Sequence, residues 1–404
     1  MATVVVSAYR VATKPEIGGH FWVYLQYAHA LRRLGCDVVW LEKVPNGALS
    51  RSPGTIPAFL SRMARYGLSG KVILYEPTRN GDLRFLGMER ADAEAVLGRA
   101  DLLLNFHYAI DPSVLSRFRR TALVDIDPGL LQFWIAGGQL QVAPHDFYLT
   151  TGETVGTPGS RIDDCGLPWM HIRPPVCLDL WPYKHDAACR RFTTVSSWLA
   201  REYLTEGDRV IYQNDKSVSF LRFAELPSRA SCELELALYL EGRVDAEDRE
   251  LLERHGWRVR HALEVAGSPE RYRAYIQSSR GEFSCVKPSC VELQNAWVSD
   301  RSLCYLASGK PVVVQDTGAS AFLPDGEGMF RFSTIDEAAD ALAAIDADYE
   351  RHCRAAREIA EKFFDAETIL AEVLELTETS PSRVNPSVTP SSRGSSSPSG
   401  RTSA

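Results

Sequence analysis

The hydrophobic pattern at the N-terminus predicts a strand, a helix and a second strand. Thr3–Ala8 is a short run rich in β-branched residues, which is typical of a strand covered on both faces. A polar loop ending in Gly18 and Gly19 follows, and Gly35 suits the end of a helix before a second strand, Asp37–Leu41. Between them apolar side chains recur at helical spacing, at Phe21, Tyr24, Leu25, Ala28 and Leu31. These segments form a βαβ unit.

The same alternation continues through the rest of the N-terminal half. Further buried strands are expected at Lys71–Tyr75, Leu102–Phe106, Thr121–Asp125 and Phe147–Thr150, with helical stretches between most of them. This order is typical of a doubly wound parallel sheet. The pair Pro174-Pro175 suits a stiff connection between domains.

The alternation then starts again in the C-terminal half. The expected strands are Arg191–Val195, Leu234–Tyr239, Trp257–Val259, Gly281–Cys285 and Pro311–Val314, and the expected helices are Asp245–His255, Pro269–Ser278, Ser299–Ala307, Ile335–Ile345, Tyr349–Phe364 and Ala366–Leu376. We therefore predict an α/β protein with two Rossmann-like domains that face each other across a cleft. The predicted domains are 1–175 and 176–364, followed by a C-terminal helix at 365–378 that crosses back to the first domain.

Residues 379–404 differ from the rest in composition. They contain ten Ser and four Pro in 26 residues and almost no apolar side chains. Such a segment cannot bury enough surface to offset its ordering entropy, so we expect it to be disordered.

Charge and cysteine content exclude some classes of protein. The formal net charge is −7, from 45 Lys and Arg against 52 Asp and Glu, which argues against a nucleic-acid-binding protein. The nine Cys are scattered without a CxxC pair, as in reduced cytoplasmic proteins, and no structural metal is expected. The sequence shows neither a long apolar run nor a basic, apolar leader, so stable membrane attachment and secretion are not expected.

Two segments have the residues that an anion-binding site needs. Gly18-Gly19-His20 precedes a helix, where glycines let a ligand approach the backbone, although a simple turn and cap explains them equally well. Ser299 can cap a second helix that begins with Asp300 and Arg301. This helix start is a candidate cradle for a diphosphate, and a capped helix with a structural Asp–Arg pair is the alternative.

The second half also carries a family resemblance. The run Ser308-Gly309-Lys310-Pro311-Val312-Val313 resembles the "C-G-K-P-V-V" segment of GT-B glycosyltransferases of the glycogen-synthase-like (family 4-like) group. Other segments resemble that group in order along the chain, namely Gly18-Gly19, Asn105-Phe106-His107, Gln315-Asp316-Thr317-Gly318 and Gly326-Glu327-Gly328-Met329-Phe330. The resemblance spans residues 1–376.

The resemblance implies a reaction and roles for residues. It implies transfer of a sugar, without a metal or other cofactor, from a nucleotide-diphosphate sugar, UDP- or GDP-linked, to a hydroxyl acceptor, with retention at the anomeric carbon. His107 would face the donor sugar, and Asp300 and Glu282 are the candidate catalytic carboxylates. The diphosphate would lie near Gly18, Gly19, Lys216, Ser299 and Arg301, with Arg222 as an alternative cation, and the base or sugar near Asp316, Thr317 and Gly318. A soluble small molecule is the expected acceptor.

The chain also departs from that group. Two glutamates usually stand where this sequence has Ala296 and Cys304, and neither side chain can accept hydrogen bonds from sugar hydroxyls as a carboxylate does. Asp300, Glu282 or Glu292 are candidate replacements, so we interpret the chain as a divergent branch. A nucleotide-sugar epimerase or hydrolase and a non-catalytic binding protein therefore stay as alternatives.

Three residues of the first domain are weaker candidates for acceptor binding. They are His20, Asp127 and Glu153. Asp127 belongs to Asp125-Ile126-Asp127, which imitates a DxD metal motif, but Pro128-Gly129 follows directly, which favours a turn near the cleft.

Overall fold

The first eight strands form one sheet in the order β4-β3-β2-β1-β5-β6-β7-β8. The computed structural model describes residues 1–47, 54–78, 82–200, 204–206, 209–212, 214–240, 242 and 245–378, so the Ser- and Pro-rich segment 379–404 lies outside it. The strands are β1 (Thr3–Ala8), β2 (Asp37–Lys43), β3 (Val72–Pro77), β4 (Leu83–Leu86), β5 (Leu102–Asn105), β6 (Thr121–Asp125), β7 (Phe147–Thr150) and β8 (Trp169–His171). All neighbours pair in parallel except β3 and β4.

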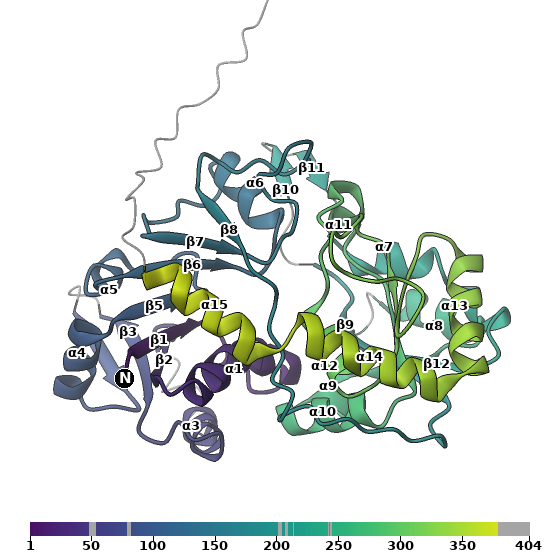
Figure 1. Cartoon of the computed structure of the whole chain (residues 1–404), viewed down its shortest axis with the longest axis horizontal. Coiled ribbons are helices and arrows are strands. Elements are labelled where there is room, and N and C mark those ends of the chain that lie inside the picture. Colours follow the sequence, from purple (N-terminus) through teal and green to yellow (C-terminus); the bar gives the residue numbers. More distant parts are fainter. Residues whose placement is uncertain are drawn as a thin grey trace, which may run out of the picture.

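Helices connect these strands and cover the sheet (Figure 1). They are α1 (Gly18–Arg33), α3 (Thr55–Arg65), α4 (Arg90–Arg99), α5 (Pro112–Leu115) and α6 (Leu130–Ala136). The prediction placed Gly18 and Gly19 in the loop before the first helix, and this is wrong because the helix begins at Gly18. The strand prediction holds for Thr3–Ala8, Thr121–Asp125 and Phe147–Thr150, whose bounds agree with the structure.

The second domain repeats the same order in a six-stranded parallel sheet, β13-β12-β9-β14-β15-β16. Its strands are β9 (Arg191–Ser197), β12 (Glu233–Tyr239), β13 (Arg258–His261), β14 (Gly281–Ser284), β15 (Val312–Gln315) and β16 (Met329–Phe332), and a hairpin is formed by β10 (Leu204–Glu206) and β11 (Arg209–Tyr212). The helices are α7 (Lys216–Leu221), α8 (Ala246–Arg254), α9 (Ala262–Ala266), α10 (Pro269–Gln277), α11 (Pro288–Leu293), α12 (Asp300–Ala307), α13 (Ile335–Ala347), α14 (Tyr349–Phe363) and α15 (Ala366–Glu378), with a 3-10 turn at Leu226–Ser228.

Each sheet is therefore doubly wound, which confirms the predicted fold class. In both sheets the first strand lies in the middle and the chain winds outward on either side of it. Such sheets bind ligands in the crevice beside the first strand, outside the carboxyl ends of the two strands between which the direction of winding reverses. In this protein these places are the ends of β1 and β5 in the first sheet, and of β9 and β14 in the second.

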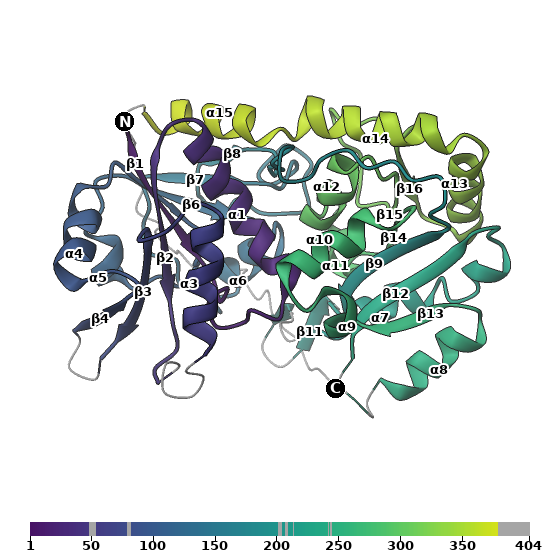
Figure 2. The same cartoon turned by 90° about the horizontal axis from the view of Figure 1, so that it is seen from below.

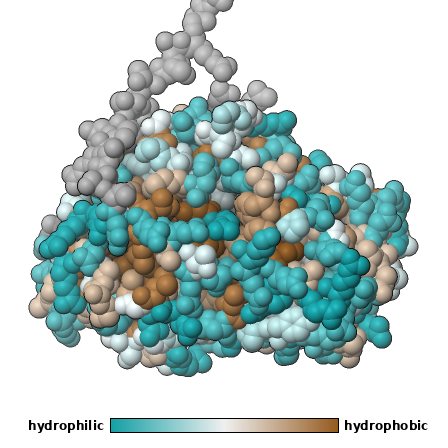
Figure 3. Space-filling model, viewed as in Figure 1, coloured by the Kyte–Doolittle hydropathy of each residue, from teal (hydrophilic) through white to brown (hydrophobic). Residues whose placement is uncertain are grey.

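The last two helices run across both domains (Figure 2). Where the chain passes from α14 to α15 it pairs with the connection between the domains, because Val176 N–H donates to Phe364 O at 2.8 Å and Ala366 N–H donates to Val176 O at 3.2 Å. Helix α15 then packs against α1 of the first domain. Hydrophobic side chains visible in Figure 3 gather near the middle of the molecule, around α15.

A single apolar core also joins the two domains. It includes Trp22 of α1, whose ring lies 4.9 Å from that of Trp181 and whose indole N–H donates to Pro269 O at 2.9 Å. Among the described helices, none combines the length and the apolar character that a membrane crossing requires.

Candidate functional site

The carboxyl ends of the two sheets meet at one interdomain face. We use this name for the segments that follow β1, β5, β6 and β7 in the first domain and β9, β14 and β15 in the second, with the first turns of α7 and α12. Hydrogen bonds cross this face between loops of the two domains. They include Asn295 Nδ2 to Pro128 O at 3.0 Å and Ala321 N–H to Glu153 Oε1 at 2.5 Å.

The glycine pair at the start of α1 touches the second domain directly. A Cβ on Gly18 would lie 2.4 Å from Ser268 O, and one on Gly19 would lie 2.9 Å from the Tyr272 ring. Neither glycine has a positive φ, so the missing side chain serves close approach and not an unusual backbone conformation. The structure thus gives this pair a packing role, and contact with a diphosphate stays a prediction.

His107 follows β5 and lies at the interdomain face of the first domain. Its backbone N–H donates to Asn105 Oδ1 at 3.0 Å, and its ring meets the edge of Tyr9 with centroids 5.0 Å apart. Burial, followed by the charge of Lys43, lowers the pKa of His107. The ring is therefore neutral at pH 7, and its buried Nδ1 has no hydrogen-bond partner among the described residues. A neutral ring with a free nitrogen can bind a sugar hydroxyl.

His20 contacts the loop that follows β1. Its Nε2 lies 2.5 Å from Tyr9 O and its ring meets Tyr24 edge-on with centroids 5.1 Å apart. Burial lowers the pKa of His20 as well. These contacts hold the loop after β1, and acceptor binding by His20 stays a prediction.

Arg301 fills the gap where β9 and β14 diverge. Its Nε donates to Glu282 Oε1 at 2.5 Å, its Nη1 to Val195 O at 2.9 Å and its Nη2 to Ser284 Oγ at 2.5 Å. Burial would lower the pKa of Arg301, but the Glu282 carboxylate raises it, so the guanidinium is charged. Three of the five N–H groups of Arg301 thus donate to the protein, which gives Arg301 and Glu282 a structural role, and their diphosphate-binding and catalytic roles stay predictions. Both hold the strand ends in place.

Lys216, the first residue of α7, has no such partner among the described residues. No carboxylate of the described residues lies within ion-pairing distance of its ammonium group. Burial, and then the charges of Arg301 and Lys287, lower the pKa of Lys216 to about 7. A half-buried cation among other cations is stabilised by an added anion.

Asp300 begins α12 behind Ser299, whose hydroxyl accepts from Arg301 N–H at 3.3 Å and so caps the helix. Burial raises the pKa of Asp300, while Arg301 and then Lys216 oppose the shift. Burial and nearby carboxylates, Asp300 among them, also raise the pKa of Tyr24 and Tyr27. The Asp300 carboxylate therefore shares one electrostatic environment with the cations Arg301 and Lys216 and with the tyrosines of α1.

Asp125 ends β6 and Asp127 lies just past it, and the two carboxylates have different partners. Asp125 is fully buried and accepts from Gln132 Nε2 and Thr150 Oγ1, each at 2.8 Å, and burial raises its pKa to about 6. Asp127 reaches across the interdomain face to Lys287, with Nζ 2.8 Å from Oδ1 and 3.0 Å from Oδ2. Among the described residues, no group of three or more His, Cys, Asp or Glu side chains is arranged to hold a metal ion.

The loop after β15 is folded tightly onto the segment before α12. Gly318 N–H donates to Asp316 Oδ1 at 3.1 Å, and Thr317 Oγ1 donates to Trp297 O at 2.9 Å. Gly318 has a φ of 111°, and a Cβ there would lie 3.1 Å from the Gln294 backbone. Glu153 of the first domain lies against the same loop through Ala321, and its other carboxylate oxygen is buried without a hydrogen-bond partner among the described residues.

Ala296 and Cys304, which stand where the resembled group has glutamates, have different surroundings. Ala296 lies in this segment with a φ of 53°, and its N–H donates to Thr317 O at 2.9 Å. Cys304 faces the core, where its thiol donates to Asp300 O at 3.3 Å. Glu292, the other candidate replacement, is exposed.

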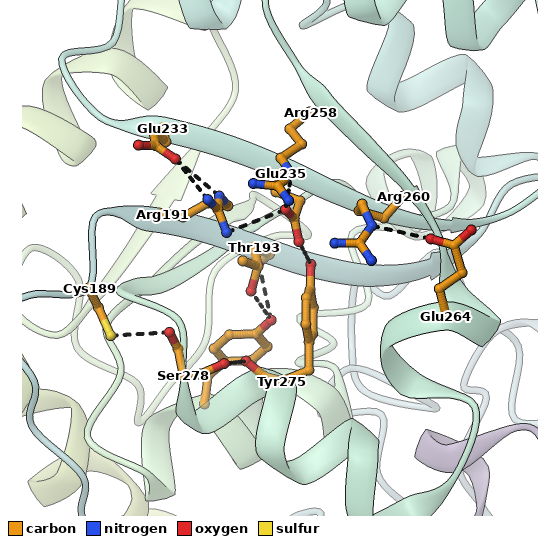
Figure 4. A network of polar contacts seen from close by, with 11 residues as sticks. Cys189, Arg191, Thr193, Glu233, Glu235, Arg258, Arg260, Glu264, Tyr275 and Ser278 are labelled. Carbon is orange, nitrogen blue, oxygen red and sulfur yellow. Dashed lines mark hydrogen bonds and ion pairs between the residues drawn. The ribbon is translucent and has the colours of Figure 1, made fainter.

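A second polar network lies near the amino ends of β9, β12 and β13, at the opposite end of these strands from the interdomain face (Figure 4). Its centre is the buried Glu235 of β12, which accepts from Tyr275 OH at 2.7 Å and pairs with Arg258 Nε at 3.0 Å. Arg191 Nη1 lies 3.5 Å away. This carboxylate accepts one hydrogen bond and forms two ion pairs, so we interpret it as structural.

Sequence reasoning missed Lys287 of the interdomain face and Tyr27 of α1. Lys287 lies just past β14. A basic residue that follows a predicted strand in this way could have been recognised as a candidate anion ligand. Tyr27 was not considered, and its hydroxyl is buried with no hydrogen-bond partner among the described residues.

Comparison with known proteins gives structural but no sequence matches. No family model matches this chain, and no curated protein matches its sequence. An α-glucosyltransferase solved with UDP and a 13-mer DNA containing a central A:G mismatch aligns over 94% of this chain and 100% of its own, with a TM-score of 0.58 and 10% identity.

Two further structures align over similar lengths. AviGT4, a glycosyltransferase involved in avilamycin A biosynthesis, covers 94% of this chain and 97% of its own, with a TM-score of 0.53 and 15% identity. Anabaena Alr3699/HepE, solved with UDP and glucose, covers 94% and 100%, with a TM-score of 0.51 and 13% identity. This chain therefore has the GT-B fold of these glycosyltransferases.

Proposed function

We propose that this protein is a glycosyltransferase that uses a nucleotide-diphosphate sugar as donor. The observation that carries the proposal is Lys216. It is a cation at the carboxyl edge of the second sheet, close to two other cations and without a carboxylate in ion-pairing distance among the described residues. Such a site is electrostatically incomplete until an anion binds. The similar structures that contain UDP support a donor of this class.

The proposed reaction proceeds without a metal ion. Lys216 would neutralise the charge that develops on the leaving diphosphate, which is the kind of stabilisation that lowers a transition-state barrier. The first turn of α12, capped by Ser299, adds its free N–H groups. Asp316, Thr317 and Gly318 would lie beside the base or sugar of the donor.

His107 and Asp300 would act on the transferred sugar. The neutral ring of His107 would orient a hydroxyl, and the Asp300 carboxylate would stabilise positive charge at the anomeric carbon, in a reaction that retains its configuration. Asp300 would thereby supply the carboxylate that Ala296 and Cys304 cannot. We propose a small-molecule hydroxyl as acceptor, bound by the first domain.

Donor binding and turnover are tested by titration with UDP, GDP, ADP and dTDP, followed by incubation with the matching nucleotide sugars. Release of the nucleoside diphosphate only when an acceptor is present supports a transferase. Release without any acceptor would identify a hydrolase, and conversion of the donor to an isomer an epimerase. Tight binding without consumption of any donor would identify a non-catalytic protein.

A further inference from the structure

Asp127 and Lys287 form an ion pair between the two domains at the ends of two central strands. Asp127 stands just past β6 and Lys287 just past β14, and both carboxylate oxygens lie within 3.0 Å of the ammonium nitrogen. The Lys287 and Asp127 side chains are 24% and 36% exposed. Water reaches the pair, so it is held weakly enough to exchange partners.

Lys287 and Lys216 come from two segments that are bonded together. Ser289 Oγ donates to Asn214 Oδ1 at 2.6 Å, which joins the first turn of α11 to the residues before α7. The charge of Lys287 is also one of the two nearby cations that lower the pKa of Lys216. The two ammonium groups therefore share one electrostatic environment.

The counter-ions of Arg301 and Lys287 come from different domains. Glu282 neutralises Arg301 from within the second domain. The carboxylate on Lys287 instead comes from the first domain, on a loop that must move away if the domains separate to admit a donor. The Asp127 carboxylate thus occupies the side of Lys287 that an anionic ligand would also need.

We propose that Asp127 is an internal counter-ion that the diphosphate of the donor replaces, so that Lys287 and Lys216 bind the diphosphate together. This inference rests on the proposed function and names a second cation of the same site. It makes Asp127 a competitor of the donor and not a group that binds the acceptor.

This competition predicts the direction in which two substitutions change the affinity for an anionic ligand. Asp127→Asn removes the negative charge that competes for Lys287, so an anionic ligand binds more tightly. Removing the cation with Lys287→Met weakens binding. If the pair only holds the domains together, both substitutions loosen the same contact and change binding in the same direction.

The test is titration calorimetry of the full chain with inorganic pyrophosphate, the group that all nucleoside diphosphates share, and with UDP in parallel. We expect pyrophosphate to bind Asp127→Asn about threefold or more tightly, and Lys287→Met about tenfold more weakly, than the unmodified protein. Lys287→Arg keeps the charge and should retain most of the affinity. In the double variant, Asp127→Asn should bring no further gain over Lys287→Met.

The matched control is the ion pair between Asp37 and Lys71, at 2.8 Å, on the amino-end side of β2 and β3. Asp37→Asn and Lys71→Met make the same charge changes far from the interdomain face and should leave pyrophosphate binding unchanged. Melting temperatures show that each variant is folded.

The outcomes separate the inference from the proposed function. If the unmodified protein binds pyrophosphate or UDP but Asp127→Asn behaves like Asp37→Asn, or weakens binding, the inference is overturned and the proposed function stands. If the unmodified protein binds neither ligand nor any other nucleoside diphosphate, both are overturned.

Discussion

A Cβ atom on Gly18 would lie 2.4 Å from the carbonyl oxygen of Ser268, so the first turn of α1 rests directly on the backbone of the other domain. Trp22, one turn further along α1, adds its indole N–H bond to Pro269 O in the same contact. This contact fixes how closely the two carboxyl edges approach, and the chemistry at the interdomain face depends on that distance.

Gly18→Ala should therefore destabilise the protein. The added methyl group meets backbone atoms that cannot rotate away, and we expect the free energy of unfolding to fall by about 1–3 kcal/mol in chemical denaturation. The control is Gly98→Ala in α4, where a Cβ meets nothing within 4 Å, and it should stabilise by about 1 kcal/mol. Equal effects of the two substitutions would refute the contact.

The buried pair of Arg301 and Glu282 should be structural. Arg301→Met leaves Glu282 buried without its cation, and we expect a loss of about 3–5 kcal/mol in the free energy of unfolding. The double variant Arg301→Met/Glu282→Leu removes both charges and should recover much of that loss. A single variant of normal stability that no longer binds nucleotide would instead make Arg301 a phosphate ligand.

Lys216 should take up a proton when a diphosphate binds. Its pKa is about 7 in the donor-free protein, and a bound anion favours the charged ammonium and raises that pKa. Between about pH 7 and 9, binding therefore draws a proton from the buffer and weakens as the pH rises. Titration calorimetry in two buffers of different ionisation enthalpy measures the uptake, which Lys216→Met should abolish; an enthalpy independent of buffer in the unmodified protein contradicts the assignment.

Asp300 and Lys216 should both lower the barrier of the reaction. We expect Asp300→Ala and Lys216→Ala each to lower kcat/KM for release of the nucleoside diphosphate. The decrease should correspond to a loss of about 2–4 kcal/mol of transition-state stabilisation. Glu292→Gln is the comparison, because Glu292 is the exposed alternative carboxylate, and its rate should be unchanged. A large loss in Glu292→Gln with a normal Asp300→Ala would exchange their roles.

The sequence predicted the central strands and the two-domain fold because buried parallel strands are continuous apolar runs. Thr121–Asp125 and Phe147–Thr150 are examples with the observed bounds. Of the strands it missed, β10 and β11 form a separate hairpin, and β4, β8 and β16 lie at the outer ends of the sheets, where one side lacks a neighbour and the apolar pattern is weaker.

The site was harder to predict because a periodic pattern reports burial and not the partner of a charged group. Arg301 was expected to face a ligand, yet three acceptors distant from it in the chain, on β9 and β14, use its guanidinium. Lys287 was not considered, since its partner Asp127 lies 160 residues away and in the other domain.

The most direct measurement is a thermal-shift and calorimetric panel of UDP, GDP, ADP and dTDP against the unmodified protein and Lys216→Met. The account predicts that one nucleotide raises the melting temperature, because at a hundred times its Kd it adds about 2.7 kcal/mol to the free energy of unfolding. Lys216→Met should lose most of this shift. Failure of all four nucleotides to bind, or binding that is equal in Lys216→Met, would contradict a diphosphate site at the interdomain face.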